Sequence, residues 1–328
     1  MAELRQFVAA LPKTETHLHL EGALPLELLR RVRPEFSRPP ESWAPDFKYR
    51  DFAHFEEQVL GLAFSWYTSP ERYHEAARQV FAGHLRQNVK YVETSFASGM
   101  IEFRGLDGRA VLEAIRAAVP AGLEVRVFLG IHHRGGGPKM RPILEEALGW
   151  PELAGIDLHG PEDAPLEPWT AELWAAARRA GKYTKAHAGE FMGADFVRRI
   201  LDEVQPQRLE HGVRAVEDVG LVRELNRRGI GLDVCPISNH KLMPGVTLAS
   251  HPIRELFDAG VKVTVSTDDP ITFGNTLVDE YEALAEHRGF SRRELVQIAR
   301  HGFEVALLPA ETKRRWLEEL DRRAEAAV

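Results

Sequence analysis

The run Leu11-Pro-Lys-Thr-Glu-Thr-His-Leu-His-Leu-Glu-Gly22 is the stretch on which the fold assignment of this chain depends. Within it, Glu15, His17 and His19 alternate with uncharged side chains at the even positions. A period of two is typical of a β-strand, so both histidines are predicted to point to the same face. Two imidazoles at the carboxyl end of one strand can bind one metal ion. An isolated His-x-His pair more often forms ordinary hydrogen bonds. Whether this pair binds a metal therefore depends on the residues at the other strand ends.

Strand and helix patterns alternate along the rest of the chain. Strand patterns lie near residues 15, 91, 125, 154, 183, 208, 231 and 262, and helical patterns follow them. Repeated strand–helix units of this number are typical of the (β/α)8 TIM barrel, an α/β fold whose active site lies at the carboxyl ends of the strands. A doubly wound parallel sheet is the alternative, but the regular repetition favours a closed barrel.

We expect a single barrel domain over residues 1–328, because no later linker, repeat or low-complexity tract interrupts the pattern. The Pro-rich segment Pro34–Asp51 departs from the alternation, and a long irregular loop in a compact domain is usually functional. With the amphipathic helices that follow it, this segment predicts a lid insertion near residues 34–88. The additional helices are predicted at Phe52–Tyr67, Pro70–Gln87, Ser291–Leu307 and Ala310–Ala327.

The composition excludes several classes of protein. A net charge of −7, from 42 basic and 49 acidic residues, argues against nucleic acid or an anionic membrane as the main partner. Cys235 is the only cysteine, so an intrachain disulfide and a cysteine-rich zinc site are both excluded. We find no signal-peptide pattern and no apolar run that could span a bilayer. These features predict a soluble cytoplasmic protein of unknown oligomeric state.

Polar residues follow most of the predicted strands. In a barrel they would converge on one point, where His17, His19, His187 and Asp268 could supply three imidazoles and one carboxylate to a divalent ion such as zinc. Glu190, three residues after His187, would then lie at the rim as a proton carrier. Each motif also has an ordinary structural explanation, such as a helix start or a turn. Their joint occurrence at the strand ends favours a catalytic site.

These motifs, in this order, resemble the adenosine and adenine deaminases, which are zinc enzymes of the amidohydrolase superfamily. The resemblance spans nearly the whole chain. It rests on Pro12-Lys-Thr-Glu-Thr-His-Leu-His-Leu-Glu-Gly22, His187-Ala-Gly-Glu190, Arg208-Leu-Glu-His-Gly212, Cys235-Pro-Ile-Ser-Asn239 and Ser266-Thr-Asp-Asp-Pro270.

The resemblance implies a role for each matching residue and one Zn²⁺ per chain. The implied zinc ligands are His17, His19, His187 and Asp268. The implied proton donor to purine N1 is Glu190, and the implied base that orients or deprotonates the zinc-bound water is His211. Asp269 is the implied partner of purine N7, and the Gly160 backbone N–H that of N3. His19 and Glu21 are further expected contacts of the substrate.

The resemblance also implies the activity, an aminohydrolase acting on the cyclic amidine of a small-molecule aminopurine. We expect adenosine or a related adenine nucleoside as the substrate, with adenine and aminodeoxyfutalosine as alternatives. Glu21 and Glu210 lean toward the adenine deaminases, whereas Ser266-Thr-Asp-Asp-Pro-Ile-Thr-Phe-Gly-Asn-Thr-Leu-Val-Asp-Glu-Tyr281 looks more like the nucleoside branch. Four histidines are either further substrate contacts or ordinary loop histidines: His132, His133, His159 and His240.

Two other classes of function remain open. An amidohydrolase of different specificity, such as a lactonase, would share the barrel and the metal. The single-carboxylate pattern and Glu190 argue against its binuclear members, which usually need a bridging carboxylated lysine, although Lys185, two residues before His187, lies near the appropriate strand. A purine-binding protein without activity would normally have lost a ligand or the acid, and this chain keeps all of them.

Overall fold

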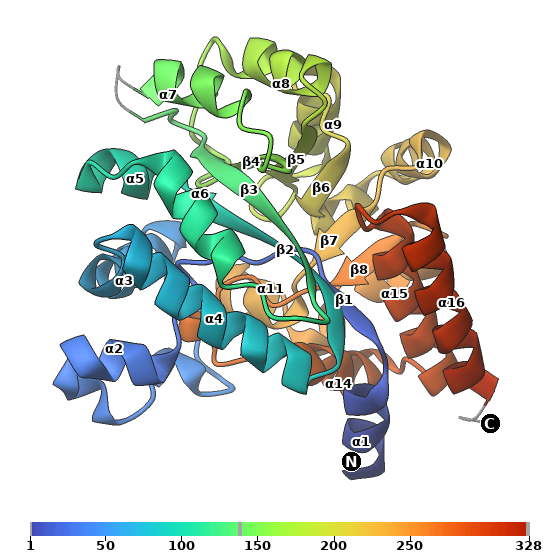
Figure 1. Ribbon diagram of the computed structural model, residues 1–328. Coiled ribbons are helices and arrows are strands. Elements are labelled where there is room, and N and C mark those ends of the chain that lie inside the picture. Colours follow the sequence, from blue (N-terminus) through green and yellow to red (C-terminus); the bar gives the residue numbers. More distant parts are fainter. Residues whose placement is uncertain (1, 137–139, 326–328) are drawn as a thin grey trace.

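The computed structural model describes residues 2–136 and 140–325, and in it eight parallel strands form a barrel surrounded by helices (Figure 1). The strands follow the chain order, and each pairs with the next in parallel. This confirms the predicted (β/α)8 architecture. The strands are β1 Lys13–Glu15, β2 Val89–Ala97, β3 Glu124–His132, β4 Gly155–His159, β5 Tyr183–Ala188, β6 Arg208–His211, β7 Leu232–Val234 and β8 Val263–Val265.

The barrel closes between β8 and β1 through the backbone of Asp268. Its N–H donates to the carbonyl of His17 at 3.1 Å, and its carbonyl accepts from the N–H of His19 at 3.1 Å. These two bonds make Leu18 and Asp268 a single parallel bridge instead of a ladder. Asp268 has a φ of 64°, in the left-handed region that residues other than glycine rarely adopt. Closure of the barrel therefore depends on three of the residues predicted to bind the metal.

The first strand is shorter than the alternation in the sequence predicts. The ladder of β1 ends at Glu15, and only isolated bridges at Leu18 and His19 continue it. The reason lies in its neighbours, because the Thr16 N–H bonds to the Ser266 hydroxyl at 3.0 Å instead of a strand carbonyl. The predicted orientation of the histidines is nevertheless confirmed, since the Nε2 atoms of His17 and His19 lie 3.2 Å apart.

Amphipathic helices form the outer ring of the barrel. Two helices near the C-terminus, α15 Arg292–Val305 and α16 Ala310–Glu325, pack on each other, and α15 also contacts β1 and β8. The predicted last residues of the final helix, 326 and 327, lie outside the described part. The sequence analysis did not predict α1 Ala2–Ala10, which contacts α14. The other ring helices are α6 Gly108–Ala117, α7 Met140–Ala147, α8 Thr170–Arg179, α9 Ala194–Glu203, α10 Val219–Arg228, α12 Ile253–Asp258 and α14 Leu277–Arg288.

The segment between β1 and β2 contains the first two of the predicted additional helices, α3 and α4. Asp51 caps the longest helix facing the site, α3, by accepting the His54 N–H at 2.8 Å. The Pro-rich part forms two short 3₁₀ turns and is held down by Trp43, whose indole N–H donates to the Ile271 carbonyl at 2.7 Å. The helices here are α2 Leu26–Val32, α3 Phe52–Trp66 and α4 Pro70–Arg86, and a short helix, α5 Ser98–Arg104, follows β2.

Charged residues fill the inside of the barrel below the site. The Lys185 ammonium donates to the Thr16 carbonyl at 2.9 Å and pairs with Glu210. The Arg208 guanidinium pairs with Glu93 and, at 2.7 Å, with Asp233. All are nearly inaccessible to solvent, and removing one partner of such a network leaves an uncompensated buried charge. Among the described residues, no helix has both the length and the apolar character needed to cross a bilayer.

We predict that Arg208→Met lowers the free energy of unfolding by ~3–5 kcal/mol, because Glu93 and Asp233 lose the nearer of their two buried cations and keep only Lys185, at 3.5 and 3.9 Å. The matched control is Arg109→Ala, which breaks the exposed pair with Glu113 at 3.3 Å and should cost less than ~1 kcal/mol. Denaturant titrations of both variants give the two values. Equal stability of the two variants would contradict the importance assigned to the buried network.

Candidate active site

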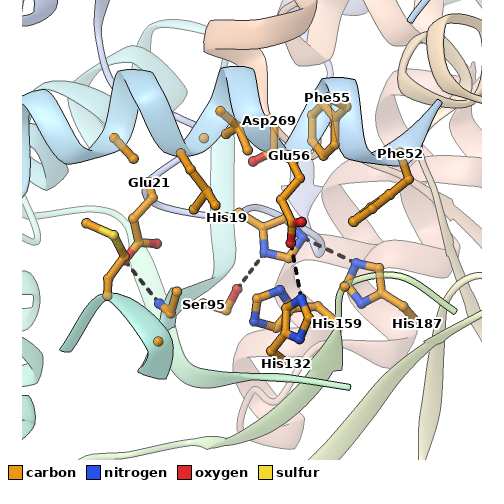
Figure 2. A pocket seen from close by; sticks show the side chains of 18 of the residues that line it. His19, Glu21, Phe52, Phe55, Glu56, Ser95, His132, His159, His187 and Asp269 are labelled. Atoms are coloured by element: carbon orange, nitrogen blue, oxygen red, sulfur yellow. Dashed lines mark hydrogen bonds and ion pairs between the residues drawn. The ribbon is translucent and has the colours of Figure 1, made fainter. Parts of the chain in front are cut away.

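A cavity of about 490 Å³ opens at the carboxyl ends of the strands. Its inner part is lined by His19, His187, Glu190, His211 and Asp268. Figure 2 shows that α3 spans this cavity, with Phe52, Phe55 and Glu56 on the helix and His19, His132, His159 and His187 opposite it. The location agrees with the rule that barrel active sites lie at this face.

Four side chains meet at one point in the inner cavity: His17, His19, His187 and Asp268. The Nε2 atom of His19 lies 3.2 Å from that of His17 and 3.3 Å from that of His187. The Oδ1 atom of Asp268 lies 3.3 Å from the Nε2 atoms of both His17 and His19. Ligands about 2.0–2.1 Å from a tetrahedral zinc ion lie about 3.3 Å from one another, so the spacing and donor set fit such an ion.

Each of these side chains is oriented by a second partner, as is usual for metal-binding residues. His17 Nδ1 lies 3.3 Å from the Asp233 carbonyl, and His19 Nδ1 lies 3.0 Å from the Ser95 hydroxyl. His187 Nδ1 lies 2.9 Å from both the Leu158 carbonyl and Glu210 Oε2. The Ser238 hydroxyl donates to Asp268 Oδ2 at 2.7 Å. With Nδ1 occupied in this way, each imidazole presents Nε2 to the common point.

Three other groups of possible ligands lie close by, and each shares a residue with the first. They contain His17 with His211 and Cys235, His187 with Asp157 and Glu210, and Asp268 with Glu190 and His211. Lys185 is not free to act as a carboxylated lysine in this arrangement, because its ammonium is ion-paired with Glu210. The pair raises the pKa of Lys185 against the effect of burial.

Glu190 and His211 lie beside the cluster and contact each other, with His211 Nε2 3.5 Å from Glu190 Oε2. The Asn239 amide connects them, donating to Glu190 Oε1 at 3.2 Å and to His211 Nδ1 at 3.1 Å. Because Nδ1 accepts this bond, neutral His211 carries its proton on Nε2, which faces the cluster. His211 has a φ of 58°, so the strained left-handed conformation occurs at two site residues.

The protonation states of these groups follow from their burial. Burial raises the pKa of Glu190 well above its ordinary value, and the Asp268 and Glu162 carboxylates add to the rise. Burial lowers the pKa of His211 well below its ordinary value, with a further contribution from His17. These directions favour the protonated form of Glu190 and the neutral form of His211.

Asp268 and Asp269 are adjacent but have opposite pKa shifts. Burial opposes the charge of Asp268, yet the imidazoles of His17, His211 and His19 outweigh it and keep its pKa well below the ordinary value. Burial raises the pKa of Asp269 well above its ordinary value, and the Asp268 carboxylate adds to the rise. This shift favours the protonated form of Asp269, which can donate a hydrogen bond. Gly22 makes room for it, since a Cβ there would lie 1.5 Å from Asp269 Oδ1.

The other predicted contacts of the substrate also line the cavity. Gly160 has a φ of 101° and touches the His132 ring, which a Cβ at this position would meet at 2.7 Å. Glu21 uses one oxygen, Oε1, to accept both the Tyr73 hydroxyl at 2.7 Å and the Ala97 N–H at 3.0 Å. Burial raises the pKa of Glu21.

Two of the four unassigned histidines reach the cavity. His132 and His159 are neighbours in the β3–β4 register, and both line it. His132 Nε2 lies 3.1 Å from Glu56 Oε1 on α3. His133 is buried and stacks on Phe196, with ring centroids 6.0 Å apart, and burial lowers its pKa to about 3. His240 lies near Lys48 and the Pro45 carbonyl, outside the cavity lining.

The sequence analysis missed two features of the site. Glu162 is buried, and its carboxylate accepts the backbone N–H groups of Glu190, Phe191 and Met192 at 3.0, 2.9 and 2.5 Å. It thereby joins the loop after β4 to the turn that carries Glu190. A charged residue two positions after Gly160 was the available signal. Helix α5 was the second omission, because its seven residues are too few to show a helical period.

Comparisons with known proteins place this geometry in a family. Residues 12–323 match the family model described as adenosine deaminase. An adenine deaminase from Sinorhizobium fredii is 34% identical over 95% of this chain and 99% of its own length. An aminodeoxyfutalosine deaminase from Streptomyces coelicolor is 31% identical over 97% of this chain and 86% of its own.

A solved structure of an amidohydrolase from Burkholderia ambifaria with bound Zn has the same fold. Its TM-score is 0.84 at 24% identity, and the likeness covers 100% of this chain and 95% of that one. With the family model matched over nearly all of the sequence, the chain belongs to the adenosine deaminase family.

Proposed function

We propose that this protein is a zinc-dependent aminohydrolase that removes the 6-amino group of an aminopurine. The observation that carries the proposal is the meeting of His17, His19, His187 and Asp268 at one point, with Glu190 and His211 beside it. Relatives named adenine deaminase and aminodeoxyfutalosine deaminase support the class of reaction. The Zn in the Burkholderia structure supports the choice of metal.

One zinc ion held by these four residues would supply a single chemistry, lowering the pKa of a coordinated water from about 15.7 to about 7. The protein's own groups do the rest. His211, held by Asn239, directs its Nε2 proton at the nucleophile and orients it toward C6. Protonated Glu190 delivers its proton to N1 as the C6–O bond forms and electron density moves onto the ring. The hydroxyl proton of the C6 adduct then passes to the amino group, which leaves as ammonia as the C6–N bond breaks and the C6 carbonyl forms. Glu190 regains the proton that the attacking water gave up.

The remaining polar groups fit the other edges of the purine. Protonated Asp269 donates to N7, which has a lone pair available, and the Gly160 N–H donates to N3. With C6 and N1 toward the metal cluster, N9 faces away from it. The second oxygen of Glu21 can accept from a hydroxyl of a sugar attached there, since its first oxygen is already bonded to Tyr73 and Ala97.

We infer adenosine or a related adenine nucleoside as the substrate. The cavity of about 490 Å³ supports this choice, because pockets of roughly 300–1,000 Å³ bury drug-sized ligands. Free adenine is the alternative favoured by the name of the Sinorhizobium relative, and aminodeoxyfutalosine the one favoured by the Streptomyces relative. Ultraviolet assays with adenine, adenosine, deoxyadenosine, AMP and aminodeoxyfutalosine distinguish among them.

We predict about one zinc ion per chain in protein purified without chelator, because the four side chains converge on one point and would hold a single ion. His187→Ala should lose most of the metal. His240→Ala, which removes a histidine outside the cavity, should retain it. Elemental analysis of the three proteins gives the ratios. Two ions per chain, or active protein without metal, would contradict the mononuclear site.

We predict that Glu190→Gln retains the zinc but lowers kcat by ~10²–10⁴-fold, because the amide has nearly the same shape and has no acidic proton to give to N1. Glu113→Gln on α6 is the matched control and should leave kcat unchanged. Steady-state kinetics and metal analysis provide both readouts. Near-normal turnover by Glu190→Gln would remove the acid role from this residue.

We predict that Glu21→Gln lowers kcat/KM for adenosine by ~5–150-fold and for adenine by much less. The amide oxygen can still accept from Tyr73 and Ala97, whereas the free acceptor for a sugar hydroxyl is lost. Tyr73→Phe is the control for indirect effects, because it removes only an internal bond of Glu21 and should act alike on both substrates. Equal losses for Glu21→Gln on the two substrates would point to adenine as the substrate.

A further inference from the structure

Three successive backbone N–H groups in the turn after β5 donate to one buried carboxylate. The Oε1 atom of Glu162 accepts from the N–H of Glu190 at 3.0 Å. Its Oε2 atom accepts from the N–H groups of Phe191 and Met192 at 2.9 and 2.5 Å. Glu162 is 3% exposed, so these bonds are shielded from water. Hydrogen bonds from N–H groups to a carboxylate are stronger than those between neutral groups, and burial strengthens them further.

We propose that Glu162 is a positioning residue for the proton donor of the reaction. Its carboxylate holds the backbone turn that carries Glu190 and thereby fixes where the Glu190 carboxyl group meets purine N1. This inference rests on the proposed function and adds a residue to it. Glu162 does not belong to the described residues that line the cavity, so it acts on the substrate through Glu190.

The turn at Glu190 has no regular secondary structure of its own. It lies between the end of β5 at Ala188 and the start of α9 at Ala194. Backbone N–H groups in an irregular buried segment need partners from outside it. Glu162 is that partner for the three central residues of the turn. The direction in which the Glu190 side chain leaves the backbone therefore depends on a carboxylate 28 positions earlier in the chain.

The carbonyl groups of the same turn are bound by another residue. The Arg214 backbone N–H donates to the Gly189 carbonyl at 2.9 Å, and the Arg214 guanidinium donates to the Phe191 carbonyl. Glu162 thus binds the N–H groups of a turn whose carbonyl groups are bound from the opposite side. With both kinds of backbone group occupied, the backbone at Glu190 has little freedom to move.

Glu162 is itself held close to the substrate site. The Ala164 N–H donates to the Pro161 carbonyl at 3.0 Å, which closes a tight turn with Glu162 at its second position. This turn directly follows Gly160, whose N–H is the expected contact of purine N3. N1 and N3 belong to the same ring and are separated by a single carbon atom, C2. One carboxylate therefore connects the segment that would contact N3 with the segment that carries the donor to N1.

The contacts of the Glu190 side chain do not replace this hold on its backbone. Glu190 Oε1 accepts from the Asn239 amide at 3.2 Å, and Oε2 lies 3.5 Å from His211 Nε2. These contacts orient the carboxyl group, but its distance from N1 also depends on the position of the turn. A displacement of ~1 Å at a reacting group can cost ~10²-fold in rate. Because the proton moves in the transition state, such a displacement lowers kcat more than it raises KM.

The test is a double-mutant cycle on the zinc-loaded enzyme, with the best substrate among the assayed aminopurines. We expect Glu162→Gln to lower kcat by ~10–10²-fold with a smaller change in KM, because an amide keeps one acceptor oxygen for three N–H groups. In the Glu190→Gln background the same change should lower kcat by less than ~3-fold, since the donor that it positions is already absent. Asp163→Asn, at the exposed next residue of the same turn, is the matched control and should leave kcat unchanged.

Hydrogen–deuterium exchange measures the hold on the turn without any measurement of activity. The amide protons of Glu190, Phe191 and Met192 should exchange at least ~10-fold faster in Glu162→Gln than in the wild type, because their acceptor is weakened. Asp163→Asn should leave the three rates unchanged. If Glu162→Gln does not fold, Glu162→Asp, whose carboxylate is one methylene group shorter, replaces it in both measurements.

The two measurements separate the positioning role from the proposed function. Equal fold-losses of kcat from Glu162→Gln in the presence and absence of the Glu190 carboxyl group would overturn the positioning role. Unchanged exchange of the three amide protons would overturn it as well. A wild-type protein that deaminates none of the aminopurines would contradict the proposed function, while the exchange rates would still support or overturn the hold of Glu162 on the turn.

Discussion

The pair of backbone hydrogen bonds from Asp268 to His17 and His19 is the constraint on which the site depends. These bonds close the barrel, and the same three residues present their side chains to the common point. A left-handed φ at Asp268 is unfavourable for an aspartate, and the surrounding structure must hold it there. The same residues therefore determine both the closure of the barrel and the arrangement of the converging side chains. The chain cannot lose its β8–β1 contact without also separating the carboxylate from the imidazoles.

Below the converging side chains, the interior of the barrel contains charged residues that form ion pairs with one another. Lys185 and Arg208 supply cations to a group of carboxylates that includes Glu210, and Glu210 in turn orients His187. Above it, burial and the neighbouring Asp268 carboxylate raise the pKa values of Glu190 and Asp269. Similar carboxyl groups thus become an ionised ligand or a neutral hydrogen-bond donor according to their neighbours. The contrast places one carboxylate with a lowered pKa directly beside two carboxyl groups whose pKa values are raised.

The periodic features of the sequence predicted the barrel and the convergence of its strand ends. Period-two alternation placed His17 and His19 on one face, and the strand ends brought His187, Glu190, His211 and Asp268 together. The features that could not be predicted from the sequence depend on contacts between residues that are distant along the chain. Glu162 acts through the backbone of the turn at Glu190, which leaves no periodic signal. β1 ends early because of Ser266, some 250 positions away. Helix α5 is too short to show its period, although it forms part of the cavity wall.

The two parts of the cavity come from different kinds of structure, and this difference bears on specificity. The reacting edge of the purine would meet side chains at strand ends, which the hydrogen-bonded sheet holds rigidly. The group on N9 would meet α3 and α5, which are additions between β1 and β3 and lie outside the ladder. Helical positions there can change without disturbing barrel closure or the four converging side chains. Relatives whose names share the deamination but differ in substrate are consistent with this division. In such an arrangement the strand ends determine which bond is broken, and the helices between them determine which molecule carries it.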